Sequence, residues 1–173
     1  EPRLIVLLTD MKPLPETWYK NGVKVVTHYQ ERPMPDAKIT SYIPAALALN
    51  KAKKVDAIEA LYMNAENEVL EGTTSNLFMF NDDTLITPKD DVLKGITRQA
   101  ILNISNRIFK VQERPILHQE LINADEVFIT GTNKGIVPVV NVDEHQIGNG
   151  RPGKNTLLMI DALEKQTLEF IQS

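Results

Sequence analysis

The chain has 173 residues, of which 42% are hydrophobic and 24% are charged, a composition typical of a globular domain. Its net charge of −4 argues against a broad nucleic-acid surface and against a polybasic membrane patch. The chain lacks cysteine, which excludes disulfides, thiolate nucleophiles and cysteine-ligated metals and fits a reducing compartment such as the cytoplasm, and no apolar run approaches the length of a membrane span.

The first third of the chain alternates apolar segments with loops marked by proline. Short apolar runs are typical of buried strands, and paired prolines are typical of linkers. In chain order, the expected elements are a strand over 4–8, a linker over 11–15, a turn at Asn21-Gly22, a strand over 23–26, a proline loop over 31–35, and a helix over 42–54 with Pro44 in its first turn.

The remaining two thirds contain more strands than helices. The expected elements are strands over 58–62, 69–70, 77–80 and 84–86, a helix from Gly95 with Ile101, Ile104 and Ile108 on one face, strands over 127–129 and 136–142, a glycine-rich loop over 148–153, and a closing amphipathic helix over 156–171. Strands and helices do not alternate strictly. The pattern therefore predicts an α+β fold, a mixed α/β pseudo-barrel, rather than a doubly wound parallel sheet.

Three stretches rich in glycine and hydroxyl side chains lie at the ends of predicted elements: 72–76, 95–97 and 130–133. Gly95-Ile96-Thr97 begins a helix, where free backbone amides, a hydroxyl and the positive end of the helix dipole favour an anion. Each stretch alone is also explained by an ordinary helix cap or turn.

Two ionisable side chains are candidates for chemistry. Lys38 lies between a proline loop and an alanine-rich helix, and a lysine among apolar residues is suited to forming a Schiff base, although a solvated surface lysine is the simpler interpretation. Glu71 lies between two strand-like segments, where a carboxylate is usually just a structural residue at a strand end. The three histidines show no metal-ligand spacing and are interpreted as surface residues.

Five blocks together resemble the class IV aminotransferases, the pyridoxal-phosphate enzymes that include branched-chain aminotransferase, D-amino-acid aminotransferase and aminodeoxychorismate lyase. The matching order and spacing extend from about Val23 to the C-terminus and are far more specific than any single block. The blocks are Lys38 with Tyr42, LEGTTSNLF (70–78), LKGITR (93–98), ADEVFITGT (124–132) and IGNGRPG (147–153).

The resemblance implies a role for each matching residue. Lys38 would carry pyridoxal 5'-phosphate as a Schiff base and act as the catalytic base, and Glu71 would contact the pyridine nitrogen and keep it protonated. The Thr and Ser residues after Glu71 would fix its carboxylate. Four further residues would complete the cofactor site: Leu93 against the ring, Ile96-Thr97 and Thr132 on the phosphate, and Tyr42 near the ring hydroxyl.

The chain departs from the family pattern at three places. Tyr42 follows Lys38 by four residues, a spacing nearer the D-amino-acid enzymes than the branched-chain enzymes. Lys134-Gly135 stands where the family often has an acidic residue before a strand. The family's smaller N-terminal domain has no counterpart, so residues 1–13 are expected to be its last strand and a linker, and residues 14–173 the large cofactor-binding domain.

The resemblance predicts an aminotransferase that moves an amino group between a small amino acid, branched-chain or D-, and a 2-oxo acid, with this chain inactive alone. It also implies a homodimer that acts on small molecules, while the charge and the histidine spacing predict no nucleic-acid partner, no membrane partner and no metal. Two alternatives stay open: aminodeoxychorismate lyase on the same scaffold, and a non-catalytic remnant. The visible absorption of bound cofactor distinguishes the enzymes from the remnant.

Overall fold

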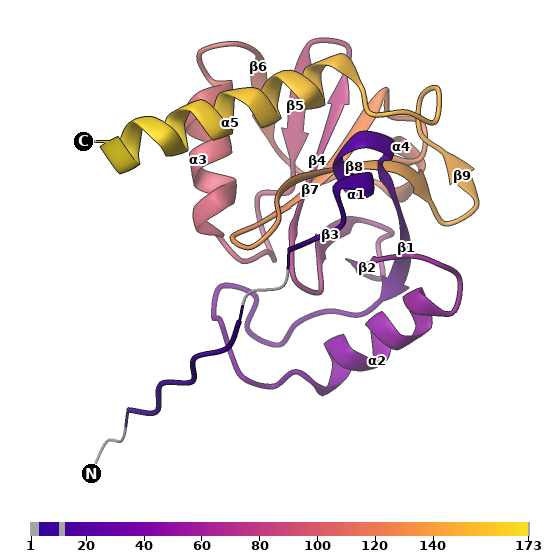
Figure 1. The fold of residues 1–173 in the computed structure, drawn as a ribbon. Coiled ribbons are helices and arrows are strands. Elements are labelled where there is room, and N and C mark those ends of the chain that lie inside the picture. The colour runs from indigo at the N-terminus through magenta and orange to yellow at the C-terminus, as the bar shows by residue number, and fades with distance from the viewer. Residues whose placement is uncertain (1–3, 11–12, 173) are drawn as a thin grey trace.

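The computed structural model describes residues 4–10 and 13–172, and its organising feature is a mixed sheet that curls on itself (Figure 1). Within the described residues the sheet has nine strands. They are β1 (Val23–Tyr29), β2 (Glu59–Met63), β3 (Val69–Gly72), β4 (Asn76–Asn81), β5 (Thr84–Thr87), β6 (Lys110–Glu113), β7 (Glu126–Gly131), β8 (Gly135–Val142) and β9 (His145–Gln146).

Six of the strands close into a ring. The strand order is β3-β2-β1-β8-β7-β4, and β4 pairs back with β3 where Glu71 lies opposite Asn76. Strand β1 is parallel to both β2 and β8, while the other pairs of the ring are antiparallel. Strands β5 and β6 extend the sheet beyond β4, and β9 pairs with β8. The predicted mixed pseudo-barrel is therefore confirmed.

Helices cover two sides of the ring. Those that the structure describes are α1 (Glu16–Asn21), α2 (Ile43–Lys53), α3 (Ile96–Ser105), α4 (His118–Leu121) and α5 (Lys154–Gln172). Helices α3 and α5 pack together on one side, and α2 lies on the other (Figure 1).

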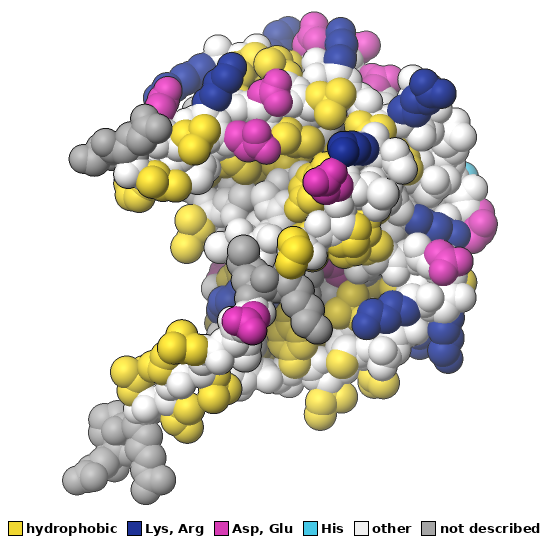
Figure 2. Space-filling view, viewed as in Figure 1, with side chains coloured by type: hydrophobic (Ala, Val, Ile, Leu, Met, Phe, Trp, Pro, Cys, Tyr) yellow, Lys and Arg dark blue, Asp and Glu magenta, His cyan; other side chains and the backbone are white. Residues whose placement is uncertain are grey.

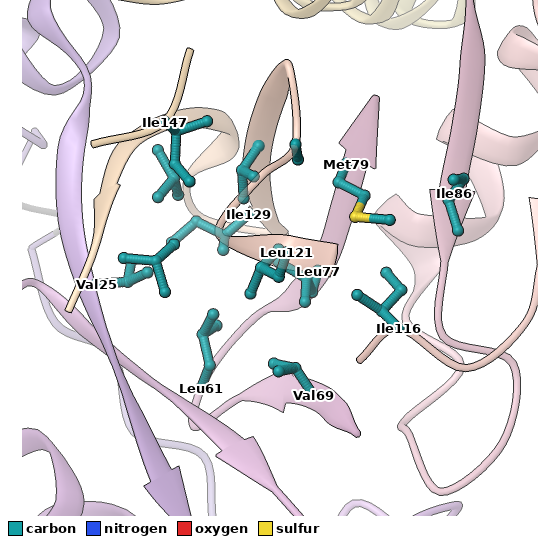
Figure 3. Close-up of a cluster of buried hydrophobic side chains, with 14 of the residues drawn as sticks. Val25, Leu61, Val69, Leu77, Met79, Ile86, Ile116, Leu121, Ile129 and Ile147 are labelled. Carbon is teal, nitrogen blue, oxygen red and sulfur yellow. The ribbon is translucent and has the colours of Figure 1, made fainter. Parts of the chain in front are cut away.

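The interior of the ring is filled by one face of each strand. In β4, Leu77 and Met79 point inward, where they meet residues such as Val25 and Leu61 from other strands (Figure 3). The alternate residues, Phe78 and Phe80, belong to a separate cluster. The period of two in side-chain direction therefore gives β4 two buried faces, which explains why its sequence reads as a continuous apolar run.

The outward faces bind the helices. Phe78 stacks on Phe128 of β7, with ring centroids 5.0 Å apart, and both pack under Ile101 of α3 and Met159 of α5. On the opposite side, the alanines of α2 lie on β2 in a third buried cluster. Small side chains let α2 approach the sheet closely, so the alanine-rich sequence of this helix has a packing reason.

Most predicted elements are present, but two expectations are wrong and four short elements were not predicted. Residues 4–8 form no strand, and their side chains are exposed as the segment projects from the ring (Figure 1), because none of the described strands lies beside it to pair with its backbone. Figure 2 shows a hollow between this segment and the C-terminal part of α5. Ile108 lies beyond the end of α3 at Ser105 and is exposed. Short elements were missed: α1, α4, β6 and β9. Part of the expected linker, residues 11 and 12, falls outside the described residues.

Glu126 anchors the start of α5. Its carboxylate accepts hydrogen bonds from the backbone amides of Asn155 and Thr156 at 3.0 and 2.7 Å, and from the Thr156 hydroxyl at 2.7 Å. Gly153 leaves room for this contact, since a Cβ there would lie 2.0 Å from Glu126 Cδ. A carboxylate at this end of a helix also complements the helix dipole.

Replacing Glu126 with alanine should lower the free energy of unfolding by about 1–3 kcal/mol, because buried donors lose their acceptor. Urea denaturation measures the change. Glu164, exposed on the same helix, supplies the control, and Glu164→Ala should change the value by less than about 0.5 kcal/mol. Equal effects of the two variants would show that Glu126 does not anchor the helix.

Candidate active site

A pocket of about 430 Å³ opens where strand ends and loops converge. Its wall comes from the loop between β1 and α2, the start of α2, the β3–β4 turn, the segment before α3, and the β7–β8 turn. All seven residues predicted from the sequence line it, although they are spread over 95 positions of the chain: Lys38, Tyr42, Glu71, Leu93, Ile96, Thr97 and Thr132. The fold therefore brings the predicted set together.

Lys38 lies at the exposed edge of this pocket. It belongs to the irregular segment between β1 and α2, and its side chain is exposed. The apolar setting expected for this lysine is therefore wrong, because the alanine side chains of α2 face the sheet and not the loop. Tyr42, immediately before α2, is also about half exposed. Both side chains are open to the pocket and to solvent.

Glu71, at the end of β3, is the buried charge of the pocket, with 3% of its surface exposed. One carboxylate oxygen accepts a hydrogen bond from Arg32 Nη1 at 2.5 Å. The other accepts from the Leu93 amide at 2.9 Å and from Asn76 Nδ2 at 3.3 Å. Burial raises the pKa of Glu71, while Arg32 and the Leu93 amide act to lower it. A carboxylate has about four acceptor positions, so these three donors leave one.

Arg32 is a pocket residue that the sequence analysis missed. Its guanidinium bridges Glu71 and the backbone carbonyl of Ala37, which accepts a hydrogen bond from Nη2 at 2.5 Å. Ala37 directly precedes Lys38. Arg32 therefore ties the loop that carries the candidate lysine to the buried carboxylate, and its position in an irregular loop gave no periodic signal.

The hydroxyl side chains after Glu71 bind a different carboxylate. Thr73, Thr74 and Ser75 all donate to Glu59, a fully buried residue of β2 that the sequence analysis also missed. The expectation that they fix Glu71 is wrong, because the turn at Gly72 directs them toward β2, where the backbone amide of Thr73 also donates to Ala60. These residues still line the pocket, but they support it through Glu59.

Lys134 supplies the cation for Glu59. Its Nζ lies 3.3 Å from Glu59 Oε2 and 2.9 Å from Thr74 Oγ1, and the side chain is 9% exposed. The aliphatic part passes over Gly131, where a Cβ would lie 3.3 Å from Lys134 Cγ. The lysine that departs from the family pattern thus joins the β7–β8 turn to the β3–β4 turn.

The N-terminus of α3 faces the pocket without a side-chain cap. Gly95 precedes the helix in extended backbone, and no side chain caps the first turn. A Cβ on Gly95 would lie 2.4 Å from Asn76 Oδ1, so glycine is required by close approach. Ile96 and Thr97, which begin the helix, line the pocket together with Thr132. Uncapped amides at the positive end of the dipole suit a bound anion.

The histidines lie outside this pocket. His118 Nε2 is 3.3 Å from Asp143 Oδ2, and its ring meets His145 edge-on, so it is more than the simple surface residue expected from sequence. Across the described residues, no group of three or more His, Cys, Asp or Glu side chains is arranged to hold a metal ion. Over the same part of the chain, no helix is long and apolar enough to span a membrane.

Comparisons with known proteins agree in pointing to one family. The family described as Amino-transferase class IV matches residues 1–142. A probable branched-chain-amino-acid aminotransferase of Aquifex aeolicus is 39% identical over 120 residues, which are 67% of this chain and 39% of that protein. The D-alanine aminotransferase of Bacillus licheniformis is 32% identical over 158 residues, 89% of this chain and 56% of that enzyme.

Solved structures give the same result. The branched-chain amino acid aminotransferase of T.th. with pyridoxamine 5'-phosphate matches with a TM-score of 0.82 and 30% identity, over 89% of this chain and 53% of that one. The same enzyme complexed with N-(5'-phosphopyridoxyl)-L-glutamate matches with a TM-score of 0.80 and 30% identity, over 84% of this chain and 52% of that one. The chain thus spans about half the length of these structures.

Proposed function

Because the chain belongs to the class IV aminotransferases, whose cofactor is pyridoxal 5'-phosphate, we propose that it forms the cofactor pocket of an enzyme that transfers an amino group between a small amino acid and a 2-oxo acid. The observation that carries the proposal is the meeting in one pocket of Lys38, the buried Glu71 carboxylate and the uncapped start of α3. The substrates are taken from the relatives, which act on branched-chain amino acids or D-alanine.

The pocket fits this cofactor in its charges and its size. A volume of about 430 Å³ lies within the usual range for small-molecule sites. At one end Glu71 retains an acceptor position for a protonated ring nitrogen, and at the other the α3 amides and hydroxyls suit a phosphate group. When bound, pyridoxal 5'-phosphate supplies an aldehyde carbon and an electron-accepting ring.

Lys38 is the proposed catalytic residue. Its Nζ would hold the cofactor through the aldehyde carbon. As a free amine, Lys38 would accept the Cα proton of a substrate and donate it again, acting as the general base and acid. The Arg32 bridge to Ala37 holds the backbone beside Lys38, which keeps the lysine near the pocket despite its exposure.

Glu71 sets the charge of the ring. Its carboxylate would accept a hydrogen bond from the protonated ring nitrogen and keep that proton in place, which favours withdrawal of electrons from the Cα–H bond. Leu93 would pack against the ring, Tyr42 would lie near the ring hydroxyl, and Ile96, Thr97 and Thr132 would hold the phosphate. All of these residues line the pocket in which Glu71 lies.

Reduction with borohydride should fix the cofactor covalently on Lys38. The 173-residue chain is incubated with pyridoxal 5'-phosphate, its visible absorption is recorded, and peptide mapping follows the reduction. The expected result is a visible absorption band and a pyridoxyl group on Lys38, with the nearby lysines of α2, Lys51 and Lys53, unlabelled. A label on those lysines instead would contradict the assignment, and a chain that never acquires the band would favour a non-catalytic remnant.

The chain spans only about half the length of its relatives, and we propose that turnover requires a longer protein than these 173 residues. We propose that a further part of that protein closes the pocket and contacts the substrate carboxylate, since an open pocket orients substrates poorly. Assembly as a homodimer, which the resemblance implies, and a cytoplasmic location, which the lack of cysteine suggests, stay predictions.

A further inference from the structure

Thr130, the penultimate residue of β7, carries a buried hydroxyl without a partner. The residue is 1% exposed, and its Oγ1 makes no hydrogen bond to any residue that the structure describes. Buried polar atoms are nearly always paired, because losing water without gaining a protein partner is unfavourable. Thr130 also lines the pocket. A hydroxyl in this position is explained if a ligand supplies the missing acceptor.

The neighbours of Thr130 show which way its side chain points. Thr130 pairs with Asn76 across β7 and β4, and paired residues of antiparallel strands point to the same face. The Asn76 amide donates to the Leu93 carbonyl, and its Oδ1 lies against Gly95, which precedes α3. Phe128, two residues earlier on the same face, packs under Ile101 of α3. Thr130 is about 7 Å further along the strand and therefore lies near the start of that helix.

The start of α3 and the Thr130 hydroxyl thus form one subsite. The helix has ten residues, lacks a side-chain cap and presents its positive end to the pocket. We propose that Thr130 Oγ1 donates a hydrogen bond to the phosphate group held at the N-terminus of α3, in addition to the groups of Ile96, Thr97 and Thr132. This inference rests on the proposed function, since it takes the phosphate to be that of the cofactor.

A ligand-binding hydroxyl and a structural hydroxyl give opposite results when valine replaces threonine. Valine keeps the shape of Thr130 and removes only the unpaired hydroxyl, so the ligand-free chain loses no hydrogen bond. Thr130→Val should therefore unfold at the same temperature as the original chain or higher. The bound state loses a hydrogen bond to a charged group, which corresponds to about a ten- to hundredfold weaker affinity.

The experiment uses the 173-residue chain and three probes: pyridoxal 5'-phosphate, pyridoxal without phosphate, and inorganic phosphate alone. Thr130→Val is expected to lower the affinity for pyridoxal 5'-phosphate and for inorganic phosphate about ten- to hundredfold, and to leave the affinity for pyridoxal unchanged. Thr130→Ser, which keeps a hydroxyl, should bind all three nearly as the original chain does.

Thr87→Val is the matched control. Thr87 is fully buried in β5, outside the pocket, and its hydroxyl donates to the Leu77 carbonyl at 2.7 Å. This variant should unfold at a lower temperature and keep its affinity for all probes, the reverse of Thr130→Val. The contrast separates loss of a structural hydrogen bond from loss of a ligand contact.

The inference is overturned if Thr130→Val binds pyridoxal 5'-phosphate as tightly as the original chain does. It is also overturned if Thr130→Val loses as much affinity for pyridoxal as for pyridoxal 5'-phosphate. An original chain that binds none of the three probes overturns both this inference and the proposed function. Binding of inorganic phosphate that depends on Thr130, without any binding of pyridoxal 5'-phosphate, would uphold the anion contact and reject the cofactor.

Discussion

Replacement of Glu71 with glutamine should slow transfer of the substrate's Cα proton by about 10²–10³-fold in the complete protein. An amide in place of the carboxylate cannot hold the ring nitrogen in its charged form, so the ring accepts electrons poorly. The Leu93 amide, which donates to Glu71 at 2.9 Å, can still donate to the amide oxygen of glutamine. Arg32 donates to the other carboxylate oxygen and loses its acceptor in this variant, so the free energy of unfolding is measured beside the rate. Single-turnover absorption measurements with an excess of amino acid follow the half-reaction directly.

Glu126→Gln is the control for this prediction. Glu126 is also a largely buried carboxylate on the end of a strand, but it caps α5 and does not line the pocket. Its replacement should affect the free energy of unfolding and leave the half-reaction rate unchanged. A Glu71→Gln variant with the original half-reaction rate would refute the proposed role of the carboxylate.

The effect of pH on cofactor affinity gives a second measurement on the same variant. Burial raises the pKa of Glu71, and only its ionised form attracts the protonated ring nitrogen. Affinity should therefore fall as the pH is lowered through that raised pKa, because the protonated carboxyl must first lose its proton for the cofactor to bind. Glu71→Gln should lose this part of the pH dependence.

Elements with a regular pattern could be predicted from the sequence. The strands β4 and β7 are continuous apolar runs, and α5 is strongly amphipathic, because each buries defined faces against the ring. Residues 4–8 follow the same apolar pattern and yet form no strand, since a strand also requires a neighbour to satisfy its backbone. Periodicity describes a face that can be buried, and it does not supply the partner.

In the candidate site, too, residues with a local sequence pattern could be predicted, and residues whose roles depend on distant contacts could not. Gly95-Ile96-Thr97 could be found because a glycine before a helix has a local meaning, and the structure requires glycine there. Arg32 and Glu59 could not be found, because their roles arise from contacts across 39 and 75 positions, to Glu71 and Lys134 respectively. Neither residue belongs to a periodic face or a recognised motif. Only the folded arrangement shows which carboxylate each hydroxyl and each cation meets.

The pair of Glu59 and Lys134 leads to the largest expected effect on stability. Glu59 is fully buried and Lys134 is its cation, 3.3 Å away. Lys134→Met removes the charge and leaves the carboxylate in the protein interior. Breaking a buried pair in this way typically costs about 3–5 kcal/mol, far more than the hydroxyls of the β3–β4 turn can compensate.

Two further variants separate the buried charge from the loss of packing. Lys24 pairs with Glu144, of which 86% is exposed, so Lys24→Met should change the free energy of unfolding by no more than about 1 kcal/mol. Adding Glu59→Gln to Lys134→Met removes the unpaired charge and should recover most of the loss. Glu59→Gln alone is the third single variant needed. Urea denaturation of the original chain, Lys134→Met, Glu59→Gln and the double variant completes the double-mutant cycle, and Lys24→Met is the control outside it.

The cycle also tests the pocket, because this pair joins two adjacent turns that both line its wall. Lys134 extends from the β7–β8 turn, while Thr73, Thr74 and Ser75 of the β3–β4 turn donate to the same carboxylate. If the pair positions these turns, the double variant should regain stability but still bind pyridoxal 5'-phosphate more weakly, since the turns are no longer joined by a charge. A Lys134→Met variant as stable as Lys24→Met would contradict the buried pair. A double variant with fully restored cofactor affinity would show that hydrogen bonding within each turn already holds the wall in place.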